Sequence, residues 1–391
     1  MNPTDTGSVI YVDHSATTPV HPDVVAAMAP YFGASFGNPS SIHRLGQEAH
    51  RAVEDSRLQV AEILDCQPGE IVFTACGSES DNLAVRGVAL ANQQRGRHII
   101  ISAIEHHAVL HTAQDLEKRF GFELTVVPVD GQGLVGPAVV ADAIRGDTIL
   151  ISVMYANNEV GTVQPIAEIG ALARERGIPF HTDAVQAAAY LDLRVDSLNV
   201  DLMALSGHKH YAPKGVGVLY VRRGTRIWPT LTGGGQEQNS RAGTHNVPYI
   251  VGMATALRIV QEGRESENRR LTALRKRLAE ALLAAIPEAQ MTGSPTGRLP
   301  GHLSLTLDGI EAEGVLMGLD LEGICASSGS ACTSGAAEPS HVLRAMGLPL
   351  SRCYGALRFS LGYQNTMSDI DRVIAVLPAL VRRLKQATAV H

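Results

Sequence analysis

Residues 48–222 alternate between segments with helical periodicity and short apolar segments. The helical segments include EAHRAVEDSRLQVAEIL, ESDNLAVRGVALANQQ and PIAEIGALARERG, and the apolar ones include HIIIS, DTILISVMY, IPFHTDA, DLMALS and GVGVLYV. The apolar segments show little alternation with polar residues, which is typical of strands that helices cover on both faces. Because a strand–helix–strand order connects parallel strands, the pattern predicts an α/β fold built on a mostly parallel sheet.

The length of 391 residues is enough for two domains. A long helix with a strongly charged face is predicted over residues 262–287, after the last strand of the alternating series. Beyond it lie the strand-like segments HLSLTLDG and LRFSLG and a closing helix, MSDIDRVIAVLPALVRRLKQA. We therefore expect a domain change near residue 257.

The composition excludes several classes of protein. A net charge of −6 gives no electrostatic reason to bind nucleic acid or an anionic membrane, and the longest apolar runs are shorter than a membrane span. The N-terminal residues MNPTDTGSVIYVDHS show no signal peptide pattern. The five cysteines are odd in number and form no CxxC pair, which indicates free thiols in a reducing cytoplasm. We expect a cytoplasmic protein without nucleic-acid or membrane partners.

Polar residues with chemical potential follow several of the predicted strands. Lys209 comes directly after DLMALS, and Asp183 lies at the end of IPFHTD. In an open α/β sheet the ligands bind outside the carboxyl ends of the strands, so these two side chains are expected to share one crevice. Gly77 and Ser78 follow the strand IVFT and open a helix, where backbone N–H groups can bind an anion.

An amine, an isolated carboxylate and a phosphate cradle are the groups that bind pyridoxal 5′-phosphate. A carboxylate near the pyridine nitrogen favours the protonated ring and shifts its pKa by roughly 1–3 units. Each residue alone has a simpler interpretation, since Asp183 is also a helix-capping type and Lys209 a typical surface residue. His107 and His111 lie four residues apart, but no acidic residue follows at metalloprotease spacing, so no metal site is expected.

The chain closely resembles the bacterial cysteine desulfurases, which belong to the class V aminotransferase group of fold type I pyridoxal-phosphate enzymes. The resemblance rests on motifs in family order: YVDHSATTP, GNPSSIH, SESDNLAVRG, NNEVG, HTDAVQ, SGHKHYAPKGVG, GGGQEQNSRAGTHN, SSGSACTSG and LRFSLG. It implies a large domain with a mostly parallel seven-stranded sheet and a smaller α+β domain. The implied division is an N-terminal segment (1–15) that packs with the small domain, a cofactor-binding domain (16–256), and a small domain (257–391) that carries the catalytic cysteine.

The resemblance also assigns the cofactor-binding residues. Lys209 matches the Schiff-base lysine, which is also a catalytic base. Asp183 matches the partner of the pyridine nitrogen, Gln186 the group that bonds the phenolic oxygen, and Asn158 a further cofactor contact. His106 matches a catalytic imidazole stacked on the ring.

The phosphate of the cofactor has its own set of implied ligands. These are Gly77, Ser78, Ser206 and His208, together with Thr244, which resembles a ligand lent by a neighbouring subunit. A shared ligand of this kind implies a homodimer.

The remaining implied residues concern the substrate, L-cysteine. Arg358 matches the residue that binds the substrate carboxylate, a task that suits the guanidinium fork, and Asn38 is also assigned to substrate binding. Cys332 matches the sulfur acceptor and lies in a stretch rich in Gly, Ser and Ala that is typical of a loop. Cys325 and Cys353 are expected to be inert.

The implied reaction removes sulfur from L-cysteine, releases L-alanine and leaves a persulfide on Cys332. The sulfur would pass to an acceptor protein, such as an iron–sulfur scaffold or a tRNA-thiolation protein. Two enzymes of the same fold remain as alternatives, a selenocysteine lyase and a small-amino-acid aminotransferase. A non-enzymatic binding scaffold is a third alternative, although each implied position holds a competent residue.

Overall fold

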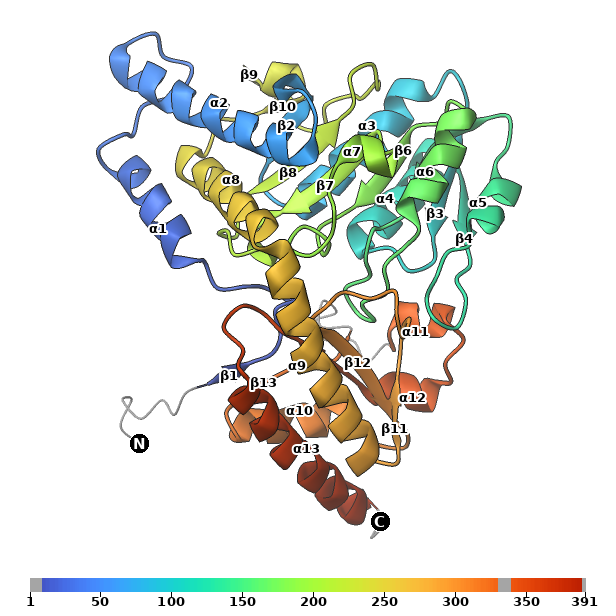
Figure 1. The fold of residues 1–391 in the computed structure, drawn as a ribbon. Coiled ribbons are helices and arrows are strands. Elements are labelled where there is room, and N and C mark those ends of the chain that lie inside the picture. Colours follow the sequence, from blue (N-terminus) through green and yellow to red (C-terminus); the bar gives the residue numbers. More distant parts are fainter. Residues whose placement is uncertain (1–8, 330–338, 389–391) are drawn as a thin grey trace.

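The computed structural model describes residues 9–329 and 339–388. Its largest sheet has seven strands in the order β2-β8-β7-β6-β5-β3-β4 (Figure 1). The strand β8 is antiparallel to both of its neighbours, and every other pair is parallel. The predicted α/β fold with a mostly parallel seven-stranded sheet is therefore confirmed. The bounds are β2 (Ile71–Thr74), β3 (His98–Ser102), β4 (Glu123–Val127), β5 (Thr148–Ser152), β6 (Phe180–Asp183), β7 (Leu202–Ser206) and β8 (Gly217–Val221).

Helices cover both faces of this sheet, which explains why its strands are apolar throughout. Ile99 and Ile101 of β3 pack into one core with the helices α3 and α4, whereas Ile100 packs into a second core with α2, α6 and α8. Side chains that alternate along a strand point to opposite faces, so each face needs its own apolar set. The helices are α1 (Pro22–Met28), α2 (Arg44–Leu64), α3 (Gly77–Asn92), α4 (His107–Phe120), α5 (Pro137–Ala143), α6 (Ile166–Glu175), α7 (Val195–Leu198) and α8 (Val247–Glu262).

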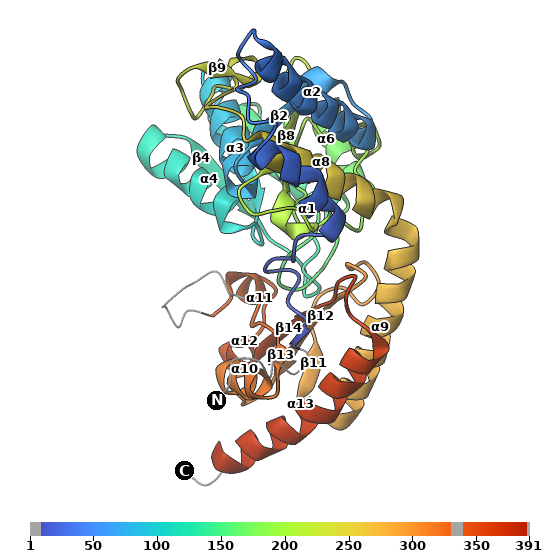
Figure 2. The same cartoon turned by 90° about the vertical axis from the view of Figure 1, so that its left-hand side faces the viewer.

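A second, smaller sheet has the order β11-β12-β14 and is antiparallel. Its strands are β11 (Ala289–Met291), β12 (His302–Leu307) and β14 (Ala356–Ser360). The helices α9 (Arg264–Ala285) and α13 (Met367–Thr388) run alongside each other at one side of this unit (Figure 2). Shorter helices complete it: α10 (Ala312–Leu321), α11 (His341–Ala345) and α12 (Leu350–Tyr354).

The two units have separate apolar cores. Residues of α8 from Val247 to Leu257 pack against the seven-stranded sheet, and those of α9 from Leu271 onward pack in the small unit. The N-terminal strand β1 (Ile10–Tyr11) pairs with β13 (Ile324–Cys325) of the small unit. These contacts support the division into 1–15, 16–256 and 257–391, which we keep as a proposal.

The remaining short strands, β9 (Gly235–Gln236) and β10 (Arg241–Ala242), form a hairpin beside β2 and α2 (Figure 1). Within residues 9–329 and 339–388, none of the helices combines the length and the apolar character that crossing a lipid bilayer requires.

Candidate active site

A cavity of about 930 Å³ opens at the carboxyl ends of β6 and β7. It also receives residues from the N-terminal segment, from the start of α3 and from β14. The sequence-predicted residues that line it are Gly77, Ser78, His106, Asn158, Asp183, Gln186, Ser206, His208, Lys209 and Arg358. Residues that are far apart in sequence thus converge on one space, as expected at the carboxyl edge of a sheet.

Lys209 lies in a single helical turn directly after the buried strand β7. Its Nζ donates hydrogen bonds to the carbonyl oxygens of Ser15 (2.6 Å) and Ala16 (2.7 Å). These two carbonyls hold the amine at the cavity. Sequence reasoning did not assign Ser15 or Ala16, because a backbone acceptor leaves no side-chain signal in the sequence.

Asp183 ends β6 and is buried. Its Oδ1 accepts a hydrogen bond from the N–H of Val185 (2.9 Å). Burial raises the pKa of Asp183 to about 6, against the opposing effect of the positive Lys209. A carboxylate that is costly to bury alone is well suited to a cationic ligand atom. Gln186 lies beside it and donates to the carbonyl of Ser15 (2.9 Å).

His106 precedes α4 and caps it, since its Nδ1 accepts from the N–H of Ala108 (3.1 Å). Burial lowers the pKa of His106 to about 4, and Lys209 lowers it further, so the imidazole is neutral. The cap fixes the ring at the cavity wall. Behind it, burial raises the pKa of Glu105 to about 8, although Glu105 accepts from Ser102 and from the N–H of Met154.

The start of α3 has the features of a phosphate cradle. A Cβ on Gly77 would lie 2.8 Å from Cγ2 of Val185 and 3.1 Å from Cβ of Ser206, so only glycine fits there. The first N–H groups of the helix point toward this end, and their dipoles favour an anion. Ser78 and Ser206 both line this cavity.

Asp81 is a site residue that the sequence analysis missed. It lies on α3 four residues after Gly77, lines the cavity, and is 1% exposed. Among the described residues its Oδ1 has no hydrogen-bond partner, and Nε2 of His181 lies 3.6 Å away. Burial and the neighbouring Asp183 raise the pKa of Asp81 well above its usual value. The signal in the sequence was the helical i, i+4 spacing from Gly77, which places both on one face.

Asp81 also brings together three groups that can bind metal. One ligand atom each of Asp81, His106 and Asp183 lie within 4.8 Å of one another. Lys209 and Arg358 line the same cavity, and their positive charges oppose a cation there. A divalent metal ion carries twice the charge of a protonated ring nitrogen and meets twice the repulsion, so the cluster fits the ring nitrogen better than it fits the metal ion.

Arg358 lies on β14, and its side chain is 3% exposed. Its Nη2 contacts Oδ1 of Asp13 at 2.8 Å, and its Nη1 donates to the carbonyl oxygens of Asn158 (2.9 Å) and Gly329 (3.4 Å). These three partners orient the guanidinium at the cavity. A guanidinium held in this way is well suited to bind a carboxylate.

Two predicted residues do not line this cavity. Asn38 and Thr244 are exposed and lie outside its lining. Cys332 lies outside the described residues. All three assignments stay predictions.

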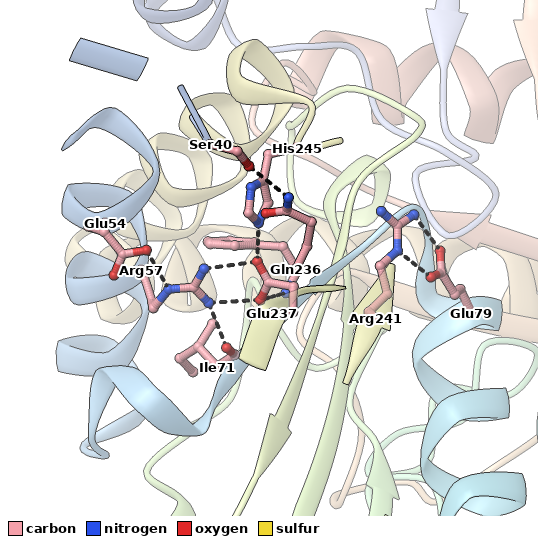
Figure 3. A network of polar contacts seen from close by, with 10 residues as sticks. Ser40, Glu54, Arg57, Ile71, Glu79, Gln236, Glu237, Arg241 and His245 are labelled. Carbon is pink, nitrogen blue, oxygen red and sulfur yellow. Dashed lines mark hydrogen bonds and ion pairs between the residues drawn. The ribbon is translucent and has the colours of Figure 1, made fainter. Parts of the chain in front are cut away.

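The segment that leads to Thr244 is fixed by a polar network (Figure 3). The guanidinium of Arg57 binds both carboxylate oxygens of Glu237, each at 2.8 Å, and His245 contacts the same carboxylate at 2.5 Å. Arg241 contacts Glu79 in the first turn of α3 at 2.8 Å. These pairs hold the β9–β10 hairpin against β2 and α3. A larger cavity of about 1220 Å³ adjoins this network, but it contains none of the predicted residues.

His210, whose role the sequence left open between packing and exposure, is fully buried. Neither ring nitrogen has a hydrogen-bond partner in the described part of the chain. Burial lowers the pKa of His210 to about 3 from 6.5. Below pH 6.5 the unfolded chain therefore binds a proton that the folded chain does not, and the free energy of unfolding falls as the pH falls.

We expect His210→Leu, a change of similar volume, to make the free energy of unfolding less dependent on pH. Between pH 6 and pH 4 the slope should decrease by up to about 1.4 kcal/mol per pH unit. Urea unfolding at several pH values measures this slope of the free energy of unfolding against pH. The exposed His50→Leu is the matched control and should leave the slope unchanged. An identical slope in His210→Leu and the parent protein would contradict the buried, neutral state of His210.

Comparisons with known proteins agree with this geometry. The family model described as "Aminotransferase class-V" matches residues 10–373. A protein of Methanosarcina thermophila named cysteine desulfurase IscS is 51% identical over 376 residues, which cover 96% of this chain and 93% of the relative.

Solved structures are similar to this chain over most of its length as well. A NifS-like protein has a TM-score of 0.91 at 35% identity, with coverage of 96% of this chain and 100% of that one. A structure of SspA in complex with cysteine has a TM-score of 0.80 at 38% identity, with coverage of 90% and 98%. The chain belongs to the class V aminotransferase family and, within it, to the cysteine desulfurases.

Proposed function

We propose that this protein removes sulfur from L-cysteine, releases L-alanine and holds the sulfur as a persulfide on Cys332. The observation that carries the proposal is the convergence of Lys209, Asp183 and Arg358 on one cavity, in a chain of this family. An amine, an acid and a carboxylate-binding guanidinium are what a pyridoxal-phosphate enzyme needs for an amino-acid substrate.

The residues at the cavity fit pyridoxal 5′-phosphate. The start of α3, where only glycine fits at position 77, suits the phosphate, together with Ser78, Ser206 and His208. Asp183 suits the protonated ring nitrogen, and the neutral His106 suits the ring face. When bound, the cofactor supplies an electron sink for negative charge at the substrate Cα.

The protein's own groups supply binding and proton transfer. Arg358 binds the substrate carboxylate and so fixes the direction of the Cα–H bond. The Nζ of Lys209, held by the carbonyls of Ser15 and Ala16, accepts the Cα proton and returns it later. General acid–base catalysis of this kind contributes roughly 10²–10⁴-fold to a rate.

The chain length near Gly329 supports Cys332 as the nucleophile. The carbonyl of Gly329 lies 3.4 Å from Nη1 of Arg358. Three residues span at most about 10 Å, so the thiol of Cys332 is within reach of a substrate that Arg358 holds. Burial raises the pKa of Cys66 to about 12 and raises the pKa of Cys353, which makes both poor nucleophiles.

In the sulfur-transfer step the Cys332 thiolate attacks the substrate sulfur. The new S–S bond forms as the Cβ–S bond breaks, and the electron pair of the broken bond stays with the carbon fragment. That fragment gains a proton and leaves as L-alanine. The persulfide then passes to an acceptor, for which an iron–sulfur scaffold or a tRNA-thiolation protein is proposed. The described cysteines are all free, which suits a cytoplasmic setting.

A product measurement tests the proposal. With L-cysteine and a thiol reductant, we expect one L-alanine and one sulfide for each cysteine consumed. With a 2-oxo acid added as amino acceptor, formation of 3-mercaptopyruvate and of the aminated acceptor instead of L-alanine would indicate the aminotransferase alternative. Much faster turnover of L-selenocysteine than of L-cysteine would indicate the selenocysteine lyase alternative. The related structure with bound cysteine favours L-cysteine as the substrate.

A homodimer is also proposed, with Thr244 reaching the partner's cofactor phosphate. Large apolar side chains are exposed near the β9–β10 hairpin and in the segment before α2: Phe36 (70%), Ile42 (92%), Trp228 (51%) and Leu231 (45%). Exposed apolar residues in such number are typical of an interface. The exposure of Thr244 in a single chain is consistent with a role in a second subunit.

Arg358→Gln is expected to lower kcat/KM for L-cysteine by about 10- to 100-fold, because hydrogen bonds to charged groups contribute about 1.5–3 kcal/mol. Steady-state kinetics measure this change. The cofactor absorbance serves as an internal check of cofactor content. Arg352→Gln is the matched control, since Arg352 lies nearby on α12 and pairs with Asp308. Equal kcat/KM values for Arg358→Gln and the parent protein would remove Arg358 from substrate binding.

A further inference from the structure

Glu159 belongs to the NNEVG turn after β5, but neither the sequence nor the cavity assigns it a role. Glu159 is buried, with 5% of its surface exposed to solvent. The turn is locked by Asn157, whose Oδ1 accepts from the N–H groups of Glu159 (2.9 Å) and Val160 (3.0 Å). Asn157 in turn donates to the carbonyl of Ile104 (3.0 Å). The carboxylate of Glu159 therefore extends from a fixed backbone.

This carboxylate touches both ends of the chain segment that contains Cys332. On one side, the hydroxyl of Ser340 donates to Oε2 of Glu159 at 2.5 Å. On the other side, a Cβ on Gly329 would lie 3.0 Å from the same Oε2 and 3.3 Å from Cβ of Glu159, so Gly329 packs directly against it. Residues 330–339 lie between these two contacts.

Each end has a second attachment. The hydroxyl of Ser340 also accepts from the N–H of Leu343 (3.1 Å) and caps α11. The carbonyl of Gly329 accepts from Arg358, which also donates to the carbonyl of Asn158, the neighbour of Glu159. One turn therefore connects the proposed substrate-binding guanidinium with both ends of the segment.

We propose that Glu159 is a positioning residue that fixes both ends of this segment relative to Arg358 and so sets the rate of sulfur transfer to Cys332. The inference rests on the proposed function of Cys332. Fixed ends reduce the number of conformations that the intervening chain explores. A nucleophile that is placed well in this way gains rate, and a displacement of about 1 Å costs as much as about 10²-fold.

The test compares two substitutions of Glu159 in the full-length holoenzyme. Glu159→Ala removes the acceptor of Ser340 and the contact with Gly329. Glu159→Gln keeps the volume and the acceptor oxygen but removes the charge. Glu168→Ala, an exposed acid on α6, is the matched control. Because a negative charge near a thiol disfavours its thiolate, the pH profile of persulfide formation separates a charge effect from positioning.

Three measurements divide the reaction into its parts. The first is cofactor affinity, and the second is the change in cofactor absorbance when L-cysteine is added. The third is the single-turnover rate of persulfide formation on the Cys332 peptide. For Glu159→Ala we expect the first two to match the parent protein and the third to fall at least about 10-fold. Glu159→Gln should restore most of that rate without a shift of the pH profile.

A parent-like persulfide rate in Glu159→Ala would overturn the inference, and so would a loss explained entirely by weaker cofactor binding. If Glu159→Ala does not fold, the variants Ser340→Ala and Ser340→Thr test the proposal instead. Threonine keeps the hydroxyl that donates to Glu159, whereas alanine removes it. Ser340→Ala should form the persulfide more slowly than the parent protein, and Ser340→Thr should regain most of the parent rate. The proposed function fails separately, if Cys332→Ser still releases L-alanine at the parent rate.

Discussion

Lys209→Ala is expected to lower turnover of L-cysteine by on the order of 10⁴-fold. The variant lacks the amine that attaches the cofactor and moves the Cα proton. The carbonyls of Ser15 and Ala16, which accept from Nζ in the parent protein, would face the cavity without that donor. Cofactor would then bind only through non-covalent contacts at the cradle and at Asp183.

Two measurements check this expectation. Alanine release gives the rate, and treatment with borohydride followed by peptide mass analysis shows whether the cofactor is attached to the chain. The parent protein should carry the cofactor on the peptide that contains Lys209. Lys214→Ala is the matched control, because Lys214 is an exposed lysine five residues later. Turnover in Lys209→Ala within tenfold of the parent rate would contradict the role of Lys209.

Cys332→Ser is expected to keep the cofactor and its change in absorbance with L-cysteine, but to release no L-alanine above background. Serine preserves the size of the side chain, yet a hydroxyl is a far weaker nucleophile toward sulfur than a thiolate. The loss should therefore appear only in the sulfur-transfer half of the reaction. This split between substrate binding and sulfur transfer separates a nucleophile from a residue that merely stabilises the fold.

The control for this variant is Cys325→Ser. Burial raises the pKa of the Cys325 thiol, and its backbone pairs with β1 rather than facing the cavity. Cys325→Ser should release L-alanine at the parent rate. The assignment of the nucleophile would be wrong if both variants kept full activity, or if Cys325→Ser alone lost it.

The alternation of helical and apolar segments predicted the large sheet well, because buried parallel strands have few polar residues. It did not reveal that β8 lies between β2 and β7 and is antiparallel to both. Strand order depends on how the crossovers pack in three dimensions, and a single sequence shows no local trace of it. The helix α8 was also missed as an element, since its segment VPYIVGMATALRIVQE is apolar on most sides and shows little helical periodicity.

The candidate site was also predictable from the sequence only in part. Residues at strand ends, such as Asp183 and Lys209, were predictable because the carboxyl edge of a parallel sheet collects ligands. Asp81 and Glu159 were not assigned, because their roles arise from tertiary contacts with Asp183, Gly329 and Ser340 rather than from a local pattern. Asn38 and Thr244 lie outside the cavity of a single chain, and both assignments stay predictions.

The most direct test of the account is the mass of the peptide that contains Cys332 after brief treatment of the holoenzyme with L-cysteine, followed by alkylation. The account predicts one additional sulfur atom on Cys332, formed in proportion to L-alanine and absent when Lys209 is replaced by alanine. Additional sulfur on Cys76, Cys325 or another thiol, with Cys332 unmodified while L-alanine is released, would contradict it.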